Sequence, residues 1–102
     1  MERERDVEAW MRREVEKLDG MFVKLTSPSR DGMPDRMVIL PGGRVVFVEL
    51  KTVRGILSRI QEWQIGALRK RGVQVCVVYG RRGAEDMMED LWSGRRLEWV
   101  YK

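Results

Sequence analysis

Two carboxylates and one amine are spaced so that they could meet at the end of a small β-hairpin. Asp35 follows a proline, and Glu49 and Lys51 end an apolar segment that begins after a turn at residues 41–43. A carboxylate that is removed from water requires an opposite charge, a hydrogen bond or a bound cation. Two carboxylates completed by waters suit Mg²⁺, and the same oxygens suit Mn²⁺. The trio therefore predicts a divalent-metal site that leaves room for the phosphate backbone of a nucleic acid.

The segments that carry this trio have the pattern of two β-strands joined by a Pro-Gly-Gly turn. Side chains alternate between the two faces of a strand, so Glu49 and Lys51 are expected to share a face with Phe47. The proline before Asp35 favours an extended chain, which suits the opening of the first strand. Hairpin pairing should then bring Asp35 beside Glu49. The two strands are expected at residues 37–40 and 45–51.

The remaining elements must hold this hairpin in place. Apolar residues at helical spacing predict an amphipathic helix that ends near Gly20. Ser58 is placed to cap a second helix that runs to about Arg71, and a β-branched run at 73–79 predicts a buried strand that is covered on both faces. Strand, helix and strand in this order predict a parallel βαβ unit, and hence an α/β fold with a mixed sheet flanked by helices. A strand at 21–25, a helix at 84–92 and an edge strand at 97–101 are also expected.

Apolar side chains on the later helices can be assigned to a side. The inner face of the helix after Ser58 is expected to carry Ile60, Trp63, Gln64, Ala67 and Leu68. Trp63 should therefore lie in the core rather than stack on a nucleic-acid base. A second apolar group fits either the core or a dimer interface, and consists of Met87, Met88, Leu91 and Trp92.

Length and charge fit one small domain with a polyanionic partner. The chain has 102 residues, which supports a single compact domain over residues 1–102. Its formal charge is +4, from 20 Lys and Arg against 16 Asp and Glu. Between Thr52 and Gly83 seven basic residues accompany one acidic residue, Glu62. Positive charge thus follows the trio and could neutralise phosphates.

Residue types that are missing exclude several kinds of site. Histidine is absent, which excludes His-based zinc sites, Ser-His-Asp triads and Cys-His nucleophilic pairs. The single cysteine, Cys76, has no intramolecular disulfide partner and is expected to be buried. The sequence has neither an apolar run long enough to span a bilayer nor a signal-peptide pattern, so no membrane association and a cytoplasmic location are expected.

The order of the residues resembles the PD-(D/E)XK nuclease motif. Pro34-Asp35 is followed, after a hairpin, by Glu49-Leu50-Lys51. The wider segments 32–36, 43–51 and 55–61 are similar to the VRR-NUC family within that superfamily, and the resemblance extends over nearly the whole chain. It implies a restriction-endonuclease-like core. It also implies the stand-alone form of the family, which is found in phages and bacteria and would act in the cytoplasm of a bacterial or phage-infected cell.

The resemblance also implies roles for individual residues. Asp35 and Glu49 would be metal ligands, Leu50 would lend its backbone carbonyl, and Lys51 would assist at the water or phosphate. Gln61 matches the glutamine that follows the sheet in the family. An acid on the first helix is implied as well. Glu4 is the preferred position for it in the family register, and Glu8 is the alternative. Glu4 falls near the apolar face of that helix, but so does Glu14, so the helical wheel alone does not select Glu4.

A metal-dependent DNA endonuclease is the function that the resemblance implies. Its members suggest a structure-selective enzyme on branched or nicked DNA, or a nickase, working as a homodimer with Mg²⁺ or Mn²⁺. Arg36, Arg54 and Arg59 lie close to the trio in sequence and are the candidate phosphate contacts. Two alternatives remain at this point: a nuclease-like fold that only binds DNA or assembles with other proteins, and a nuclease that acts on RNA.

Overall fold

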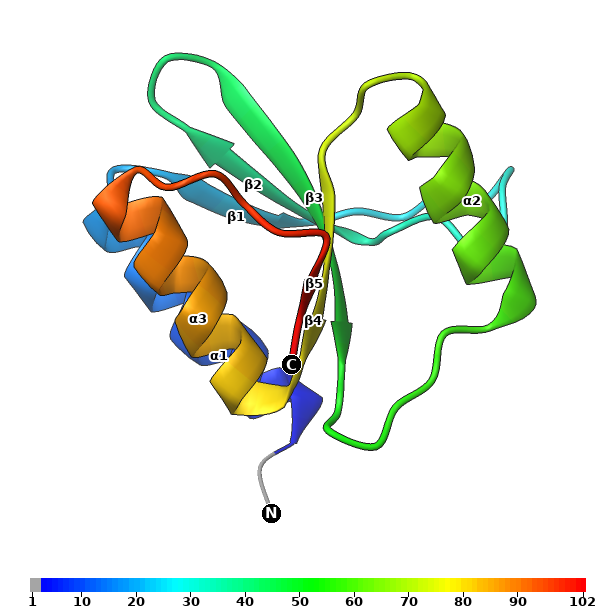
Figure 1. Ribbon diagram of the computed structural model, residues 1–102, viewed down its shortest axis with the longest axis horizontal. Helices are drawn as coiled ribbons and strands as arrows, with labels where there is room; N and C mark the ends of the chain where they lie inside the picture. The colour runs from blue at the N-terminus through cyan, green and yellow to red at the C-terminus, as the bar shows by residue number, and fades with distance from the viewer. Residues whose placement is uncertain (1–2) are drawn as a thin grey trace.

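The computed structural model describes residues 3–102, which form a five-stranded mixed β-sheet with helices on both faces (Figure 1). The strands lie in the sheet in their sequence order, from β1 to β5. The first three strands pair antiparallel, and β4 and β5 each run parallel to the strand before them. The α/β class that the sequence predicts is therefore confirmed. The elements are α1 (Glu4–Lys17), β1 (Met21–Lys24), β2 (Arg36–Leu40), β3 (Arg44–Lys51), α2 (Arg59–Lys70), β4 (Val75–Tyr79), α3 (Gly80–Ser93) and β5 (Val100–Tyr101).

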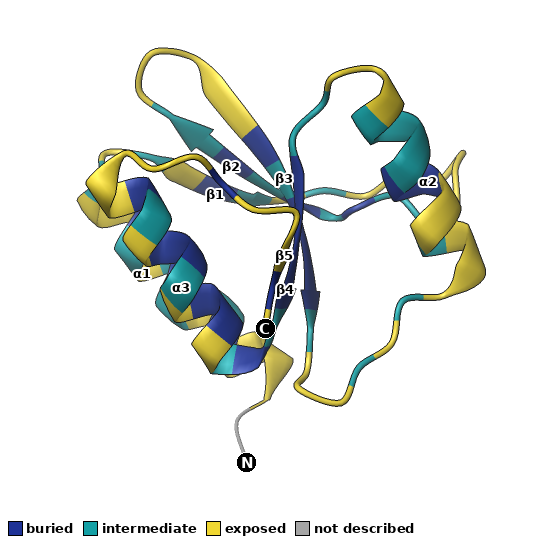
Figure 2. Cartoon of the chain, viewed as in Figure 1, coloured by how far each residue is buried: buried dark blue, intermediate teal, exposed yellow. Residues whose placement is uncertain are grey.

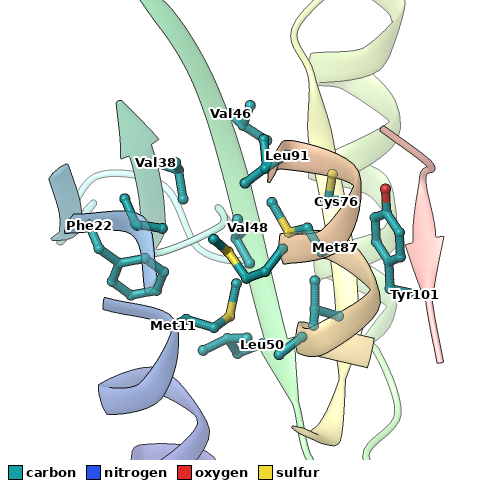
Figure 3. Packing of buried hydrophobic residues seen from close by; sticks show 14 of the residues in the cluster. Met11, Phe22, Val38, Val46, Val48, Leu50, Cys76, Met87, Leu91 and Tyr101 are labelled. Atoms are coloured by element: carbon teal, nitrogen blue, oxygen red, sulfur yellow. The ribbon is translucent and has the colours of Figure 1, made fainter. Parts of the chain in front are cut away.

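Helices α1 and α3 cover one face of the sheet together, and α2 covers the other (Figure 1). The larger core lies under α1 and α3, where Met11 and Met87 are fully buried against Val46, Val48 and their neighbours (Figure 3). A smaller core under α2 is formed by side chains of the opposite strand faces, and consists of Ile65, Val75 and Val77 with Phe47, Leu57, Leu68, Val73 and Tyr79 at its edge. Strand β4 is thus covered on both faces, as its apolar run predicts.

The register of the hairpin fixes the faces of β3. Arg36 pairs with Val48 and Val38 with Val46, and these residues face α1 and α3. Phe47 packs in the core under α2, so the alternation of a strand directs Glu49 to the α2 side as well. The predicted grouping of Phe47 with the charged end of β3 is confirmed.

Helix α3 begins earlier than the sequence predicts. It starts at Gly80, directly after β4, whereas the predicted helix begins at Ala84. The glycines that suggest a loop serve close packing instead: a Cβ on Gly80 would lie 2.5 Å from a methyl group of Val53, and one on Gly83 would lie 2.5 Å from the carbonyl oxygen of Tyr101. The expected edge strand is present, but only Val100–Tyr101 belong to it.

Two side chains that are expected on the inner face of α2 are instead exposed, Trp63 to 60% and Ile60 to 45%. The buried residues of α2 are Gln64 and Ile65, and the buried side of the helix faces the sheet (Figure 2). Among the candidates for a dimer interface, Met87 and Met88 are buried between α3 and the sheet, as is Leu91. The fourth candidate, Trp92, is exposed. Within residues 3–102, the helices are all too short or too polar to cross a bilayer.

Candidate active site

Asp35 and Glu49 face each other at the end of the β2–β3 hairpin. The paired register runs from Leu40 opposite Arg44 to Arg36 opposite Val48, and one further step puts Asp35 opposite Glu49. Directly opposed residues of an antiparallel pair share a face, with their Cβ atoms about 5 Å apart. The backbone of Asp35 is held by β1, because the amide of Leu25 donates to its carbonyl oxygen at 2.8 Å.

Glu49 is a buried carboxylate with few partners. Its side chain is 8% exposed, and its Oε2 lies 3.8 Å from Nζ of Lys51. Nε2 of Gln61 donates to the same oxygen at 3.4 Å, the long end of the hydrogen-bond range. Burial raises the pKa of Glu49 to about 7; the charge of Lys51 opposes this rise, and the carboxylates of Asp35 and Glu4 add to it. The positive charges of Lys51 and Arg36 thus do not offset the burial of Glu49.

Gln61 is oriented by the cap of α2. Oγ of Ser58 accepts a hydrogen bond from the Gln61 amide at 3.1 Å, and the backbone amide of Ser58 donates to Oε1 of Gln61 at 2.9 Å. This reciprocal capping box stabilises the first turn of the helix. Because Oε1 is already engaged, the side-chain amide presents its Nε2 to Glu49. Gln61 therefore both takes part in the cap of α2 and contacts the buried carboxylate of Glu49.

Arg36 lies at the centre of a cluster of acids. We call Arg36, Glu4, Glu8 and Asp35 the Arg36 cluster. The guanidinium is 5% exposed and forms ion pairs with Glu8 and Asp35, and Oε2 of Glu4 lies 3.7 Å away. This placement contradicts the expectation that Arg36 contacts DNA, since its side chain is buried and its donors are engaged by carboxylates of the protein itself. An arginine beside an aspartate in sequence gives no local sign of such burial.

The two candidate acids of α1 differ in how they take part in the Arg36 cluster. Glu8 is half-buried and pairs with Arg36 and with Arg12, the latter at 3.0 Å. Burial alone would raise the pKa of Glu8, but its hydrogen bonds and charge interactions with Arg36 and Arg12 outweigh burial and lower it. Glu4 is 45% exposed, and its charge acts on Glu49. Glu8 is thus engaged by two arginines, whereas Glu4 is more exposed and has one longer ion-pair contact, with Arg36.

The other predicted site residues lie around this centre. The side chain of Leu50 is buried in the larger core, and its backbone pairs with Val78 of β4. Arg54 is exposed in the loop after β3, and Arg59 is exposed at the first position of α2. Both arginines remain accessible to a ligand. The positioning roles of Arg36 and Glu8 were missed by sequence reasoning; the only signal was the four-residue spacing of Glu4 and Glu8, which puts both on one side of a helix.

A divalent cation fits the chemistry of these donors. Across residues 3–102, no three acidic or cysteine side chains converge closely enough to bind a metal by themselves. Asp35 and Glu49 could nevertheless supply two oxygens, with waters and a backbone carbonyl completing the set, as is usual for Mg²⁺. The raised pKa of Glu49 supports this fit, because a buried carboxylate that lacks positive charge would be stabilised in its ionised form by a cation.

Comparison with known proteins agrees with this geometry. No family model matches the sequence. A protein of Acyrthosiphon pisum secondary endosymbiont phage 1, named "Putative nuclease p44", is 47% identical over 49 residues, which are 48% of this chain and 53% of that protein. The chain thus spans about half the length of this curated relative. A solved structure described as "VRR_NUC domain" superposes with a TM-score of 0.78 and 33% identity, and covers 84% of this chain and 94% of its own. With this likeness in sequence and fold, the chain belongs to the VRR-NUC domain family and has its PD-(D/E)XK-like nuclease fold.

Proposed function

We propose that this domain is a divalent-metal-dependent DNA endonuclease whose active site is built on Asp35, Glu49 and Lys51. The observation that carries the proposal is the opposition of Asp35 and Glu49 at the hairpin end, with Lys51 beside the buried carboxylate. Gln61 contributes the amide that contacts Glu49, and Glu4 is the acid that α1 brings toward the site. The nuclease name of the phage relative and the VRR-NUC fold support the same reaction class.

Each side chain has a chemical task in hydrolysis of a phosphodiester. A bound Mg²⁺ or Mn²⁺ would supply the Lewis acidity that polarises a phosphoryl oxygen. Asp35 and Glu49 would hold the cation, with the carbonyl of Leu50 as a further oxygen donor. Lys51 would offset the negative charge that develops on the phosphate and would orient the attacking water. Gln61 keeps the Glu49 carboxylate oriented toward the site.

We further propose that the substrate is recognised by its backbone and shape. Arg54 and Arg59 are exposed beside the trio and would contact phosphates, which position DNA without reading its sequence. The family resemblance supports a preference for branched or nicked DNA and a homodimer. Cleavage of a panel of linear, nicked, flap and four-way DNA at one salt concentration tests the preference, and sedimentation tests the dimer.

Cleavage of supercoiled plasmid tests the central proposal. Purified wild type should nick the plasmid with Mg²⁺ or Mn²⁺ and not with EDTA. Lys51→Ala is expected to lower the rate by on the order of 100-fold, because it removes one preorganised charge from the transition state. Its affinity for DNA should stay within about twofold, since a single contact among many phosphates contributes little to binding. Lys17→Ala, an exposed lysine on α1 that pairs with Glu14, is the control for loss of charge.

Three results would contradict this proposal in whole or in part. Metal-independent DNA binding without cleavage by the wild type would leave a nuclease-like fold that only binds. A matched RNA substrate that is cut much faster than DNA would move the substrate class to RNA. Full activity of Lys51→Ala would show that the lysine takes no part in the reaction. It would not test the roles of the two carboxylates.

Replacing Arg59 is expected to change DNA binding and not the chemical step. Arg59→Ala should weaken binding and reduce the slope of log K against log salt concentration by about 0.9, the value for one lost phosphate contact. Binding titrations between low and moderate salt measure this slope. Arg13→Ala serves as the control, because Arg13 is exposed on α1, across the sheet from α2. An unchanged slope for Arg59→Ala would show that this arginine contacts no phosphate.

A further inference from the structure

A hollow lies between α2 and the loop that joins β1 and β2, and an exposed tryptophan lines it. The hollow has a volume of about 520 Å³, and Trp63 lines it with 60% of its surface exposed. Cavities of this size hold ligands about as large as a nucleotide. The backbone of Gly66 also lines it, and a Cβ added there would meet no atom within 4 Å, so the floor is open.

Charge around this hollow is mostly positive. Arg30, Lys70 and Arg71 line it, against a single acid, Glu62. Within residues 3–102, the side chains of Arg30 and Lys70 form no ion pair or hydrogen bond. Arg71 donates only to the carbonyl oxygen of Ala67, at 2.9 Å. The cationic side chains are therefore available to an anionic ligand that lies against Trp63.

The hollow continues toward the candidate active site. A second hollow of about 350 Å³ shares Arg30 and Met33 with the first and reaches Asp35. The loop between β1 and β2 forms the wall of both. It is tied to α2, because Nε2 of Gln64 donates to the carbonyl oxygen of Asp31 at 3.0 Å. The path from Trp63 to Asp35 is thus built on a segment that is held in place.

We propose that these two hollows bind a single-stranded segment of DNA and lead it to the active site. An unpaired base stacks on the indole of Trp63, and phosphates on either side of it contact Arg30, Lys70 and Arg71. Bases within a duplex are stacked on each other and cannot offer a face to a protein side chain, whereas single strands bind by this combination of stacking and charge. The inference rests on the proposed function and defines its substrate as DNA with a flap, gap or overhang beside the scissile phosphate.

Binding of fluorescent oligonucleotides in EDTA tests the proposal without cleavage. Trp63→Ala should weaken binding of a thymidine oligonucleotide of about 12 nucleotides by roughly 5- to 150-fold, the equivalent of one lost base stack. Binding of a blunt duplex of equal length should change by less than about twofold. Trp63→Tyr should retain most of the affinity, because it keeps an aromatic face. Trp92→Ala, which removes an exposed tryptophan from α3, should bind as the wild type does.

A second variant tests the hollow without altering Trp63. Gly66→Glu should weaken single-strand binding because it places a carboxylate among the phosphates, and Gly66→Gln should weaken it less. Circular dichroism establishes that each variant is folded.

Three outcomes would overturn the inference. In the first, Trp63→Ala leaves the affinity for single strands unchanged, or lowers the affinities for single strands and for duplex by the same factor. The second is an effect confined to matched RNA. The third is a shift from dimer to monomer by Trp63→Ala with unchanged DNA affinity, which would make the hollow an interface between two copies. Plasmid cleavage distinguishes failure of this inference from failure of the proposed nuclease function. If the wild type cleaves no plasmid but binds single strands in a way that depends on Trp63, the nuclease proposal is refuted and the single-strand binding site is supported.

Discussion

Glu49→Gln is expected to abolish DNA cleavage and, at the same time, to stabilise the metal-free protein. The loss of activity should be on the order of 1000-fold, because the variant removes an anionic oxygen through which a divalent cation would be held. The gain in stability follows from burial, since the side chain is 8% exposed and, among residues 3–102, has only Gln61 and Lys51 as hydrogen-bond and ion-pair partners. Glutamine fills nearly the same volume without a charge that must be desolvated.

The pH dependence of unfolding shows in which direction Glu49 changes the stability of the metal-free protein. The pKa of Glu49 is raised to about 7 by burial in the folded state, against an ordinary value of 4.5. The folded protein then holds the proton more tightly than the unfolded chain does. The resulting stability is fully present below pH 4.5 and is lost as the pH rises through about 7. In metal-free buffer at pH 8, Glu49→Gln should therefore exceed the wild type in free energy of unfolding by on the order of 2 kcal/mol.

Denaturant unfolding with and without metal measures both halves of the prediction. Mg²⁺ or Mn²⁺ should raise the stability of the wild type by binding the folded state, and should leave Glu49→Gln nearly unchanged. Glu16→Gln is the control, because Glu16 is exposed on α1 and loses the same charge. A variant that is less stable than the wild type at pH 8 without metal, or that gains as much stability from metal, would contradict the assignment of Glu49.

Arg36→Met is expected to cause the largest loss of stability, about 3 kcal/mol. The guanidinium is 5% exposed and pairs with Glu8 and Asp35, so its removal leaves acids at the sheet edge without their cation. Breaking a buried ion pair at one partner is costly because the other charge stays behind. For a domain of this size, such a loss corresponds to a decrease in Tm of on the order of 15 °C.

A matched pair of variants separates burial from charge. Arg12→Met removes another arginine that pairs with Glu8, but the Arg12 side chain is 43% exposed, so the loss should stay below about 1 kcal/mol. Adding Glu8→Leu to Arg36→Met should recover part of the stability, because the uncompensated acid is then gone as well. If Arg12→Met and Arg36→Met are equally destabilising, the burial of Arg36 does not account for its contribution to stability.

The effect of Arg36→Met should also depend on pH. Although burial acts to raise the pKa of Glu8, the interactions with Arg36 lower it below 4.5. This pairing contributes stability above pH 4.5, and the contribution is lost as the pH falls through the lowered pKa. The difference in stability between the wild type and Arg36→Met should therefore narrow in acid. Thermal unfolding at pH 7 and at pH 3 measures this narrowing.

Short-range pattern was enough to predict the hairpin and its faces. The alternation along β3 and the turn before it depend only on neighbouring residues, and they fix which side chains accompany Glu49. The cap at Ser58 is likewise local, because its partner Gln61 is three residues away. The parallel βαβ unit follows from the order of the elements, since its helix is too long a connection for a hairpin.

Expectations failed where packing between distant segments decides. Glycines at the start of α3 resemble a loop in sequence, but they are required by the close approach of Val53 and Tyr101. The rotation of α2 that exposes Trp63 is set by Ile65 packing on β4. A helical wheel shows which residues share a face, and it does not show which of two mixed faces meets the sheet.

The trio with which the candidate site begins is thus a property of the sequence, because type, order and alternation bring Asp35, Glu49 and Lys51 to one end of one hairpin. Its electrostatics were decided only by the tertiary structure. The contact between Arg36 and Glu8 spans 28 residues, and the pKa of Glu49 depends on its burial and on the charges of residues as distant in sequence as Glu4 and Asp35. Desolvation and long-range charge act through space, and no local pattern of residues records them.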